Sequence, residues 1–227
     1  IIGHDQYLQQ IDGMLYGSPP SEGIIKGRTY IHPALQIRFE VPPGFELFDT
    51  ERQVYALGPA NSQMVFDMAQ APAQLTPAAY ITQTWTRKAN LSNLNSIDVN
   101  GLAAATAWGR VRTNRGEMDL RLVAIRGSGD RVYRFRFLGP PQPGAIGNLT
   151  PVESTTLKSF RTISQREAAA AQPLRVRIVT VKTGDTIRSL SDRMAFDSFK
   201  LDRFLVLNGL KSSDRLVRGQ RLKIVTE

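Results

Sequence analysis

The stretch that most constrains the fold lies near the C-terminus, within residues 177–225. It begins with a β-branched run, 178–181, which favours a strand. Gly184 then permits a tight turn, and Asp185 can accept hydrogen bonds from the first amides of a following helix. We therefore expect a helix to begin at Thr186. Its apolar positions share one helix face: Ile187, Leu190 and Met194.

A second helix and a second strand complete this stretch. Apolar residues within 201–207 predict the helix, and Gly209 after Asn208 can take the left-handed conformation that closes it. Gly219 then makes a turn into residues 221–225, where polar and apolar residues alternate as in a half-buried strand. The predicted order is β-α-α-β.

This unit resembles the LysM module over nearly its whole length. The chain departs from the family in two places: the link 195–200 between the helices is slightly long and carries Phe196 and Phe199, and Arg218 stands where the family usually has proline. The residues that carry the resemblance occur in the family's order: Val181, Gly184-Asp185-Thr186-Ile187, Leu190, Leu205, Asn208-Gly209-Leu210, Asp214, Leu216, Gly219-Gln220, Leu222 and Ile224.

The resemblance also implies a glycan site. In the family, glycans that contain N-acetylglucosamine lie in a shallow groove between the loop after the first strand and the loop after the second helix. Backbone groups would orient the acetamido group there, while apolar side chains cover the sugar's C–H face. Each position also has a purely structural interpretation as turn, cap or core. The matching positions are Gly184, Asp185, Thr186 and Ile187 on one side and Leu210, Lys211 and Ser212 on the other.

The chain is long enough for a second hydrophobic core. With 227 residues, of which 41% are apolar, two domains are expected. No run of about 18 apolar residues occurs, so no transmembrane segment is predicted. The chain begins with Ile1 and lacks a basic-then-apolar leader, which we interpret as a fragment or a processed product without its targeting signal. Cysteine is absent, which excludes disulfides and thiolate chemistry.

The positive charge is concentrated at the C-terminus. The net charge is +9, and residues 174–227 hold 12 Lys and Arg against 6 Asp and Glu, whereas residues 1–173 hold 17 against 14. This balance favours polyanionic neighbours such as cell-wall polymer, anionic lipid or nucleic acid, and a merely solvated surface is an equal alternative. Strand alternation places Tyr133 opposite Arg134 and Arg136, whereas a stacking platform needs both kinds on one face. Nucleic acid is therefore not an expected partner.

Residues 35–163 predict an α+β domain. The short links between strands exclude crossovers, so the sheet should be largely antiparallel. Thr76-Pro77 predicts a helix start, and Thr150 with Glu153 a capping box. The opening segment 39–45 and the closing helix around Ser159-Phe160 resemble the PsbP-like fold, which implies no particular chemistry. Strands are expected at 37–41, 54–58, 64–68, 103–111, 118–126 and 131–138.

The two remaining segments flank this domain. Residues 164–173, with alanines at 168–171, should form a frayed helix or a mobile linker before the LysM-like domain at 174–227. Residues 1–34 resemble the tail that follows the catalytic domain in bacterial zinc metallopeptidases related to the CAAX prenyl protease and HtpX. The resemblance lies in four pieces: Tyr7 to Gly13, Tyr16-Gly17, Gly23 to Gly27 and His32 to Leu35. It implies a peptidase domain upstream, with zinc in that parent protein.

No catalytic or metal site is predicted within this chain. A zinc site of that peptidase class needs two histidines four residues apart with a glutamate between them, and the chain has only His4 and His32. A serine triad would have to use one of the same two residues. Carboxylate pairs for glycoside hydrolysis could come from the C-terminal unit, although capping and solvation explain them better. These carboxylates are Asp185, Asp192, Asp197, Asp202 and Asp214.

The leading hypothesis is the accessory C-terminal region of a zinc metalloendopeptidase of the periplasm or cell envelope. Its α+β domain would position a protein substrate or partner, and its LysM-like module would dock on peptidoglycan or on a protein. Whether the whole protein is an enzyme stays open. The alternatives are a free-standing wall-binding or scaffolding protein and, third, a nucleic-acid binder.

Overall fold

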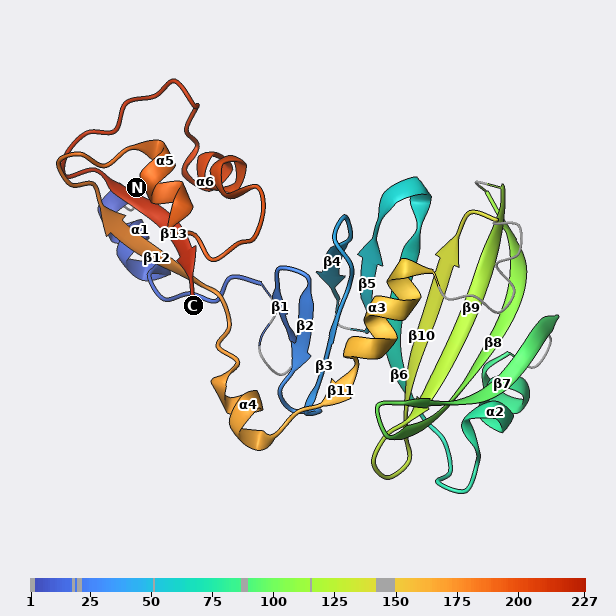
Figure 1. The fold of residues 1–227 in the computed structure, drawn as a ribbon. Coiled ribbons are helices and arrows are strands. Elements are labelled where there is room, and N and C mark those ends of the chain that lie inside the picture. Colours follow the sequence, from blue (N-terminus) through green and yellow to red (C-terminus); the bar gives the residue numbers. More distant parts are fainter. Residues whose placement is uncertain are drawn as a thin grey trace.

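The computed structural model describes residues 3–17, 19, 22–50, 52–86, 90–114, 116–141 and 150–227. Figure 1 shows a larger part built from strands and a few helices, and a smaller C-terminal unit beside which the N-terminus also lies. The described strands form sheets of seven, four and two strands, and the neighbours pair antiparallel. The predicted α+β class, with an antiparallel sheet and a small β-α-α-β unit, is confirmed.

The largest sheet has the strand order β4-β5-β6-β10-β9-β8-β7. Five of its strands match predicted ones, whereas β4 and β7 were not predicted because their short or polar runs lack clear alternation. Asn100, with a φ of 52°, makes the tight turn between β7 and β8. The strands are β4 (Glu46–Asp49), β5 (Val54–Leu57), β6 (Gln63–Gln70), β7 (Leu91–Val99), β8 (Leu102–Thr113), β9 (Gly116–Arg126) and β10 (Arg131–Gly139). A 3₁₀ turn, Pro59–Asn61, links β5 to β6.

The second sheet joins the N-terminal region to the α+β domain. Its order is β1-β2-β3-β11, and β2 pairs with β3 from Thr29 opposite Glu40 to His32 opposite Ile37. The predicted domain boundary between residues 34 and 35 falls inside this hairpin. The strands are β1 (Ile24–Lys26), β2 (Thr29–His32), β3 (Ile37–Glu40) and β11 (Arg161–Thr162).

The main core lies between the four-stranded sheet, helix α3 (Pro151–Ser159) and one face of the seven-stranded sheet. Phe39 from β3 packs edge-on against Phe135 from β10, with ring centroids 5.3 Å apart, and Phe160 packs on Phe135 at 5.5 Å. The opposite face of the large sheet is covered by α2 (Pro77–Tyr80) and a π turn (Ile81–Trp85), which bury Tyr80 and Ile81. Apolar residues on alternate positions of β9 and β10 thus serve both cores.

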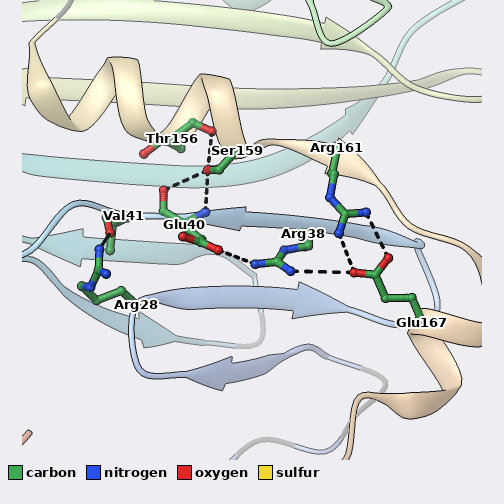
Figure 2. Close-up of polar contacts among 8 residues, drawn as sticks. All are labelled: Arg28, Arg38, Glu40, Val41, Thr156, Ser159, Arg161 and Glu167. Carbon is green, nitrogen blue, oxygen red and sulfur yellow. Dashed lines mark hydrogen bonds and ion pairs between the residues drawn. The ribbon is translucent and has the colours of Figure 1, made fainter. Parts of the chain in front are cut away.

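Polar contacts hold α3 at both ends. The predicted capping box is present, because Thr150 N donates to Glu153 Oε2 at 2.7 Å and Thr150 Oγ1 accepts from Glu153 N. Glu153 also forms a buried ion pair with Arg121 at 3.4 Å. At the other end, Ser159 Oγ accepts from Glu40 N at 2.8 Å, which ties the helix to β3 (Figure 2).

The segment predicted as a linker contains a helix, α4 (Gln165–Ala170), which Ser164 caps. Figure 2 shows how Glu167 attaches this helix to the small sheet. Its carboxylate accepts from Arg161 at 2.6 and 3.0 Å and lies 3.7 Å from Arg38. The Arg161 hydrogen bonds lower the pKa of Glu167. The segment that leads to the C-terminal unit is therefore attached to the four-stranded sheet at its N-terminal end.

The N-terminal segment packs onto the C-terminal unit. Helix α1 (His4–Ile11) contacts both strands of the two-stranded sheet, β12 (Arg175–Thr180) and β13 (Arg221–Thr226), as Figure 1 shows. Gly13 N donates to Val176 O at 2.8 Å, Val176 N to Met14 O at 2.9 Å, and Tyr16 N to Leu174 O at 2.8 Å. Residues 13–16 thus pair with β12 through an isolated antiparallel bridge, with Leu15 opposite Arg175. We call these three hydrogen bonds the N-terminal clasp.

Leu8 anchors this helix, because its side chain is only 1% exposed. We expect Leu8→Ala to lower the opening free energy of the β12 amides by about 2–4 kcal/mol, since it removes a buried side chain and leaves a cavity. Amide hydrogen exchange of Val176 in the full chain measures this. Tyr7→Ala is the matched control, because Tyr7 is 47% exposed on the same helix and its loss should cost less than about 0.5 kcal/mol. Equal effects of both changes would contradict the packing of α1.

Candidate glycan-binding site

The C-terminal unit packs two helices on the two-stranded sheet. Helices α5 (Ile187–Asp192) and α6 (Lys200–Asn208) bury Leu190 and Phe204 against Leu222 of β13. Asn208 then fastens the end of α6 to β13: its Oδ1 accepts from Lys223 N at 2.7 Å and its Nδ2 donates to Lys223 O at 2.8 Å. The same Nδ2 donates to Phe204 O at 3.0 Å. The Asn208 side chain thus satisfies both backbone groups of Lys223, as a neighbouring strand would.

The loop after β12 supplies the first half of the predicted site. Gly184 has a φ of +90°, as expected for the turn. The predicted cap is wrong by one residue: Thr186 Oγ1 accepts from Ser189 N at 3.0 Å, and Ser189 Oγ accepts from Thr186 N at 2.9 Å. Asp185 instead accepts from Lys182 N at 2.7 Å, so it closes the turn before the helix. Ile187 is 9% exposed and belongs to the core.

The loop after α6 supplies the second half. Gly209 has a φ of +63° and closes α6 as predicted. Leu210 N donates to Leu205 O at 2.9 Å, and Lys211 N donates to Asp214 Oδ2 at 2.8 Å. Lys211 and Ser212 are exposed.

Backbone contacts join the end of the second loop to the start of the first. Val181 N donates to Gln220 O at 2.8 Å, and Gly219 N donates to Val181 O at 3.0 Å. Ile187 and Leu210 contribute to one hydrophobic cluster beneath both loops. One residue from each half of the predicted site thus belongs to the same hydrophobic cluster.

Residues 179–225 match the LysM domain family. These residues form a LysM domain. The structure has the predicted order β12-α5-α6-β13, and residues 13–16 hydrogen-bond to β12, a contact that the sequence did not reveal. The departures from the family pattern lie at different places in the domain: Phe196 packs on Tyr16 at 5.7 Å between ring centroids, Phe199 is 65% exposed, and Arg218 is exposed.

Solved structures give weaker similarities over the larger part of the chain. A Bacteroides thetaiotaomicron protein is similar at 11% identity and a TM-score of 0.46, covering 74% of this chain and 59% of that one, so the chain spans less than two thirds of it. Cyanobacterial PsbP from Synechocystis is similar at 15% identity and a TM-score of 0.45, covering 64% and 98%. LpqN, involved in cell envelope biogenesis of Mycobacterium tuberculosis, is similar at 10% identity and 0.43, covering 71% and 97%. These TM-scores lie below 0.5, and the fold assignment rests on strand order and pairing.

A search among curated proteins gave no match. None of the helices in the described part of the chain combines the length and hydropathy needed to span a bilayer.

The two histidines, which were weighed as metal ligands or triad members, are not part of the predicted glycan site. His32 is 8% exposed, its Nδ1 accepts from Leu35 N at 3.3 Å, and burial lowers its pKa. The side chain of His4 lies outside the described residues. Within the described ranges, no group of three or more His, Cys, Asp or Glu gathers closely enough to hold a metal ion.

Two arginines of β10, Arg134 and Arg136, have partners of their own. Arg134 Nε lies 2.6 Å from Asp67 Oδ1 and its guanidinium stacks on Trp85 at 5.2 Å, while Arg136 Nη2 lies 3.3 Å from Asp67 Oδ2. Tyr133 is buried on the opposite face of the sheet, in the main core. Tyr133 thus lies on the face of β10 opposite Arg134 and Arg136, as the alternation predicted.

Asn208 is the side chain that best tests the LysM domain's own architecture. We expect Asn208→Ala to destabilise the domain by about 2–3 kcal/mol, because three hydrogen bonds to backbone groups are lost at about 1 kcal/mol each. Hydrogen exchange of the β13 amides measures the loss. Ser213→Ala, an exposed position in the following loop, is the control and should change it by less than about 0.5 kcal/mol. No difference between the two variants would contradict the bridging role of Asn208.

Proposed function

We propose that this chain docks its parent protein on peptidoglycan or a related glycan that contains N-acetylglucosamine, through the LysM domain. The observation that carries the proposal is the LysM family match over 179–225, together with the one apolar cluster to which Ile187 and Leu210 of the two loops both belong. The chain would act in the periplasm or elsewhere in the cell envelope, where this polymer lies. The α+β domain would present a protein substrate or partner to the anchored assembly.

The residues of the two loops divide into scaffold and contact positions. Gly184, Asp185 and Thr186 are occupied by the turn and the cap, so they offer mainly backbone groups to a sugar. Ile187 and Leu210 belong to the hydrophobic cluster beneath the loops, so they would supply the apolar floor of a sugar site. Lys211 and Ser212 are exposed, so their side chains can reach a ligand without loss of structure.

Affinity for a single glycan should be modest. A shallow surface excludes little water, and a neutral sugar gains little from charge. The domain's 12 basic against 6 acidic residues add a salt-dependent attraction to anionic polymers of the wall. Retention at the wall would therefore depend on tethering and on the density of sites.

We also propose, on the sequence resemblance of residues 1–34, that a zinc peptidase domain precedes this region in the parent protein. The reading frame upstream of Ile1 tests this directly. A helix with two histidines four residues apart and a glutamate between them supports it. Without such a helix, the free-standing wall-binding protein or scaffold becomes the better description.

We expect the full chain to co-sediment with purified peptidoglycan and to bind chitotetraose. Replacing both contact residues, Lys211→Ala with Ser212→Ala, should weaken chitotetraose binding about three- to tenfold, because a few polar contacts worth about 1 kcal/mol are lost. Isothermal titration calorimetry measures this. Met68→Ser is the control, because Met68 is 41% exposed on β6, in the α+β domain.

The salt dependence of binding distinguishes recognition of the sugar from electrostatic adsorption to the wall. Binding of neutral chitotetraose should change little between low and physiological salt, whereas purely electrostatic adsorption to the wall falls steeply. If chitotetraose does not bind and peptidoglycan binding disappears with salt, the LysM domain is not a glycan site in this protein.

A further inference from the structure

Two exposed cations, Lys182 and Arg218, lie where the end of the second loop of the LysM domain joins the start of the first. The hydrogen bonds of Val181 with Gly219 and Gln220 pair the two backbone segments here. Lys182 follows Val181 and Arg218 precedes Gly219, so the backbones of the two basic residues are neighbours. We call Lys182 and Arg218 the cation pair.

Arg218 occupies the second position of a tight turn, residues 217–220. Gln220 N donates to Val217 O at 2.9 Å, Val217 N donates to Gln220 Oε1 at 3.2 Å, and Gly219 has a φ of +89°. These features are those of a type II turn, whose second position suits proline, because its fixed φ lowers the conformational entropy of the unfolded chain. Arginine forgoes this gain and places a guanidinium on an exposed turn. The turn itself therefore gives no structural reason for an arginine.

Lys182 begins the turn that leads into the first half of the predicted glycan site. Lys182 N donates to Asp185 Oδ2 at 2.7 Å, and Asp185 N donates to Lys182 O at 3.1 Å. The carboxylate of Asp185 thus closes the turn through the backbone. The Lys182 side chain is exposed beside residues 184–187, which would hold the sugar.

Ion pairs distinguish the cation pair from other basic residues of the domain. In the part of the chain that the structure describes, neither Lys182 nor Arg218 forms an ion pair. Two neighbouring positive charges repel each other, so an acid group bound between them is favoured by both. The arginines that already have acidic partners are Arg188 with Asp192, Arg203 with Glu46 and Arg221 with Asp5.

We propose that the cation pair binds a carboxylate carried by the glycan, so that the LysM domain prefers an acidic glycan to its neutral counterpart. The proposal rests on the proposed function, because the pair adjoins the loop that would hold the sugar. A guanidinium can donate two parallel hydrogen bonds to a carboxylate, and an ammonium group adds a point charge. Peptidoglycan offers such a group: every second sugar carries a lactyl ether, whose carboxylate is free where the stem peptide has been removed.

The test compares chitotetraose with two tetrasaccharides that have the same β-1,4-linked backbone. In the first, N-acetylglucosamine alternates with N-acetylmuramic acid, and the second is the methyl ester of the first. Both carry the lactyl groups, and only the acid is charged. In isothermal titration calorimetry with the full chain at physiological salt, the acid should bind about three- to tenfold more tightly than the ester, as expected for one or two exposed ion pairs.

Substitutions locate the origin of this preference. Lys182→Gln and Arg218→Gln should each reduce it, and the double variant should bind the acid and the ester equally, with the affinity for the ester unchanged. Arg218→Lys should retain most of the preference because the charge stays. Arg112→Gln is the matched control, since Arg112 is an exposed arginine of β8 in the α+β domain and its loss changes the net charge equally.

Arg218→Pro separates binding from folding. Proline suits the second position of this turn, and Arg218 N donates no hydrogen bond within the described residues. The variant should therefore have a Tm equal to or higher than that of the unmodified chain and lose as much of the preference as Arg218→Gln. A preference that survives in Arg218→Pro overturns the proposal.

The remaining outcomes distinguish this proposal from the proposed function. If chitotetraose and the ester bind and the acid binds no more tightly than the ester, the cation pair is not a carboxylate site, although the domain still binds glycan. If none of the three tetrasaccharides binds, both proposals fail. If Arg112→Gln removes the preference as fully as Arg218→Gln, net charge is responsible, and the assignment to Lys182 and Arg218 is wrong.

Discussion

The hydrogen bonds of the N-terminal clasp are the contacts on which the rest of the arrangement depends. They hold residues 13–16 on the edge of β12, so the first and the last segments of the chain belong to one unit. The chain consequently crosses between the two domains twice, once on leaving the clasp and once on returning through α4 (Figure 1). With a single flexible connection, the LysM domain could take many orientations relative to the α+β domain. Two crossings, together with the ion pairs Arg203–Glu46 and Lys26–Glu227, favour one orientation.

This orientation separates two surfaces of the LysM domain. The predicted glycan loops follow β12 and α6. The link 195–200 precedes α6 and lines a cleft between the two domains. The loop after α6 and this link therefore lie at opposite ends of α6. Two departures from the family pattern, Phe196 and Phe199, line the cleft between the domains. They lie outside the loops after β12 and α6 that hold the predicted glycan site.

Local chemistry explains which features could be predicted from the sequence. The capping box at Thr150, the closing glycine at residue 209 and the alternation in β10 each depend on neighbours within a few positions. The cap of α5 was misplaced because Asp185 and Thr186 can both cap, and only Ser189, three residues after Thr186, decides between them. The clasp and the cleft could not be predicted, since they pair residues about 160 positions apart and their backbone contacts leave no periodic signal.

The charges of the two parts differ in how they are paired. Asp67 pairs with both Arg134 and Arg136 on the large sheet, and its single carboxylate offsets one of these two positive charges. The LysM domain carries 12 Lys and Arg against 6 Asp and Glu, so it attracts anionic polymers. Because exposed charges more than about 10 Å apart are largely screened at physiological salt, this attraction acts only on a polymer that already lies close to the domain. Charge therefore helps to hold the chain near such a polymer, whereas selection of a glycan depends on short-range contacts with the loops after β12 and α6.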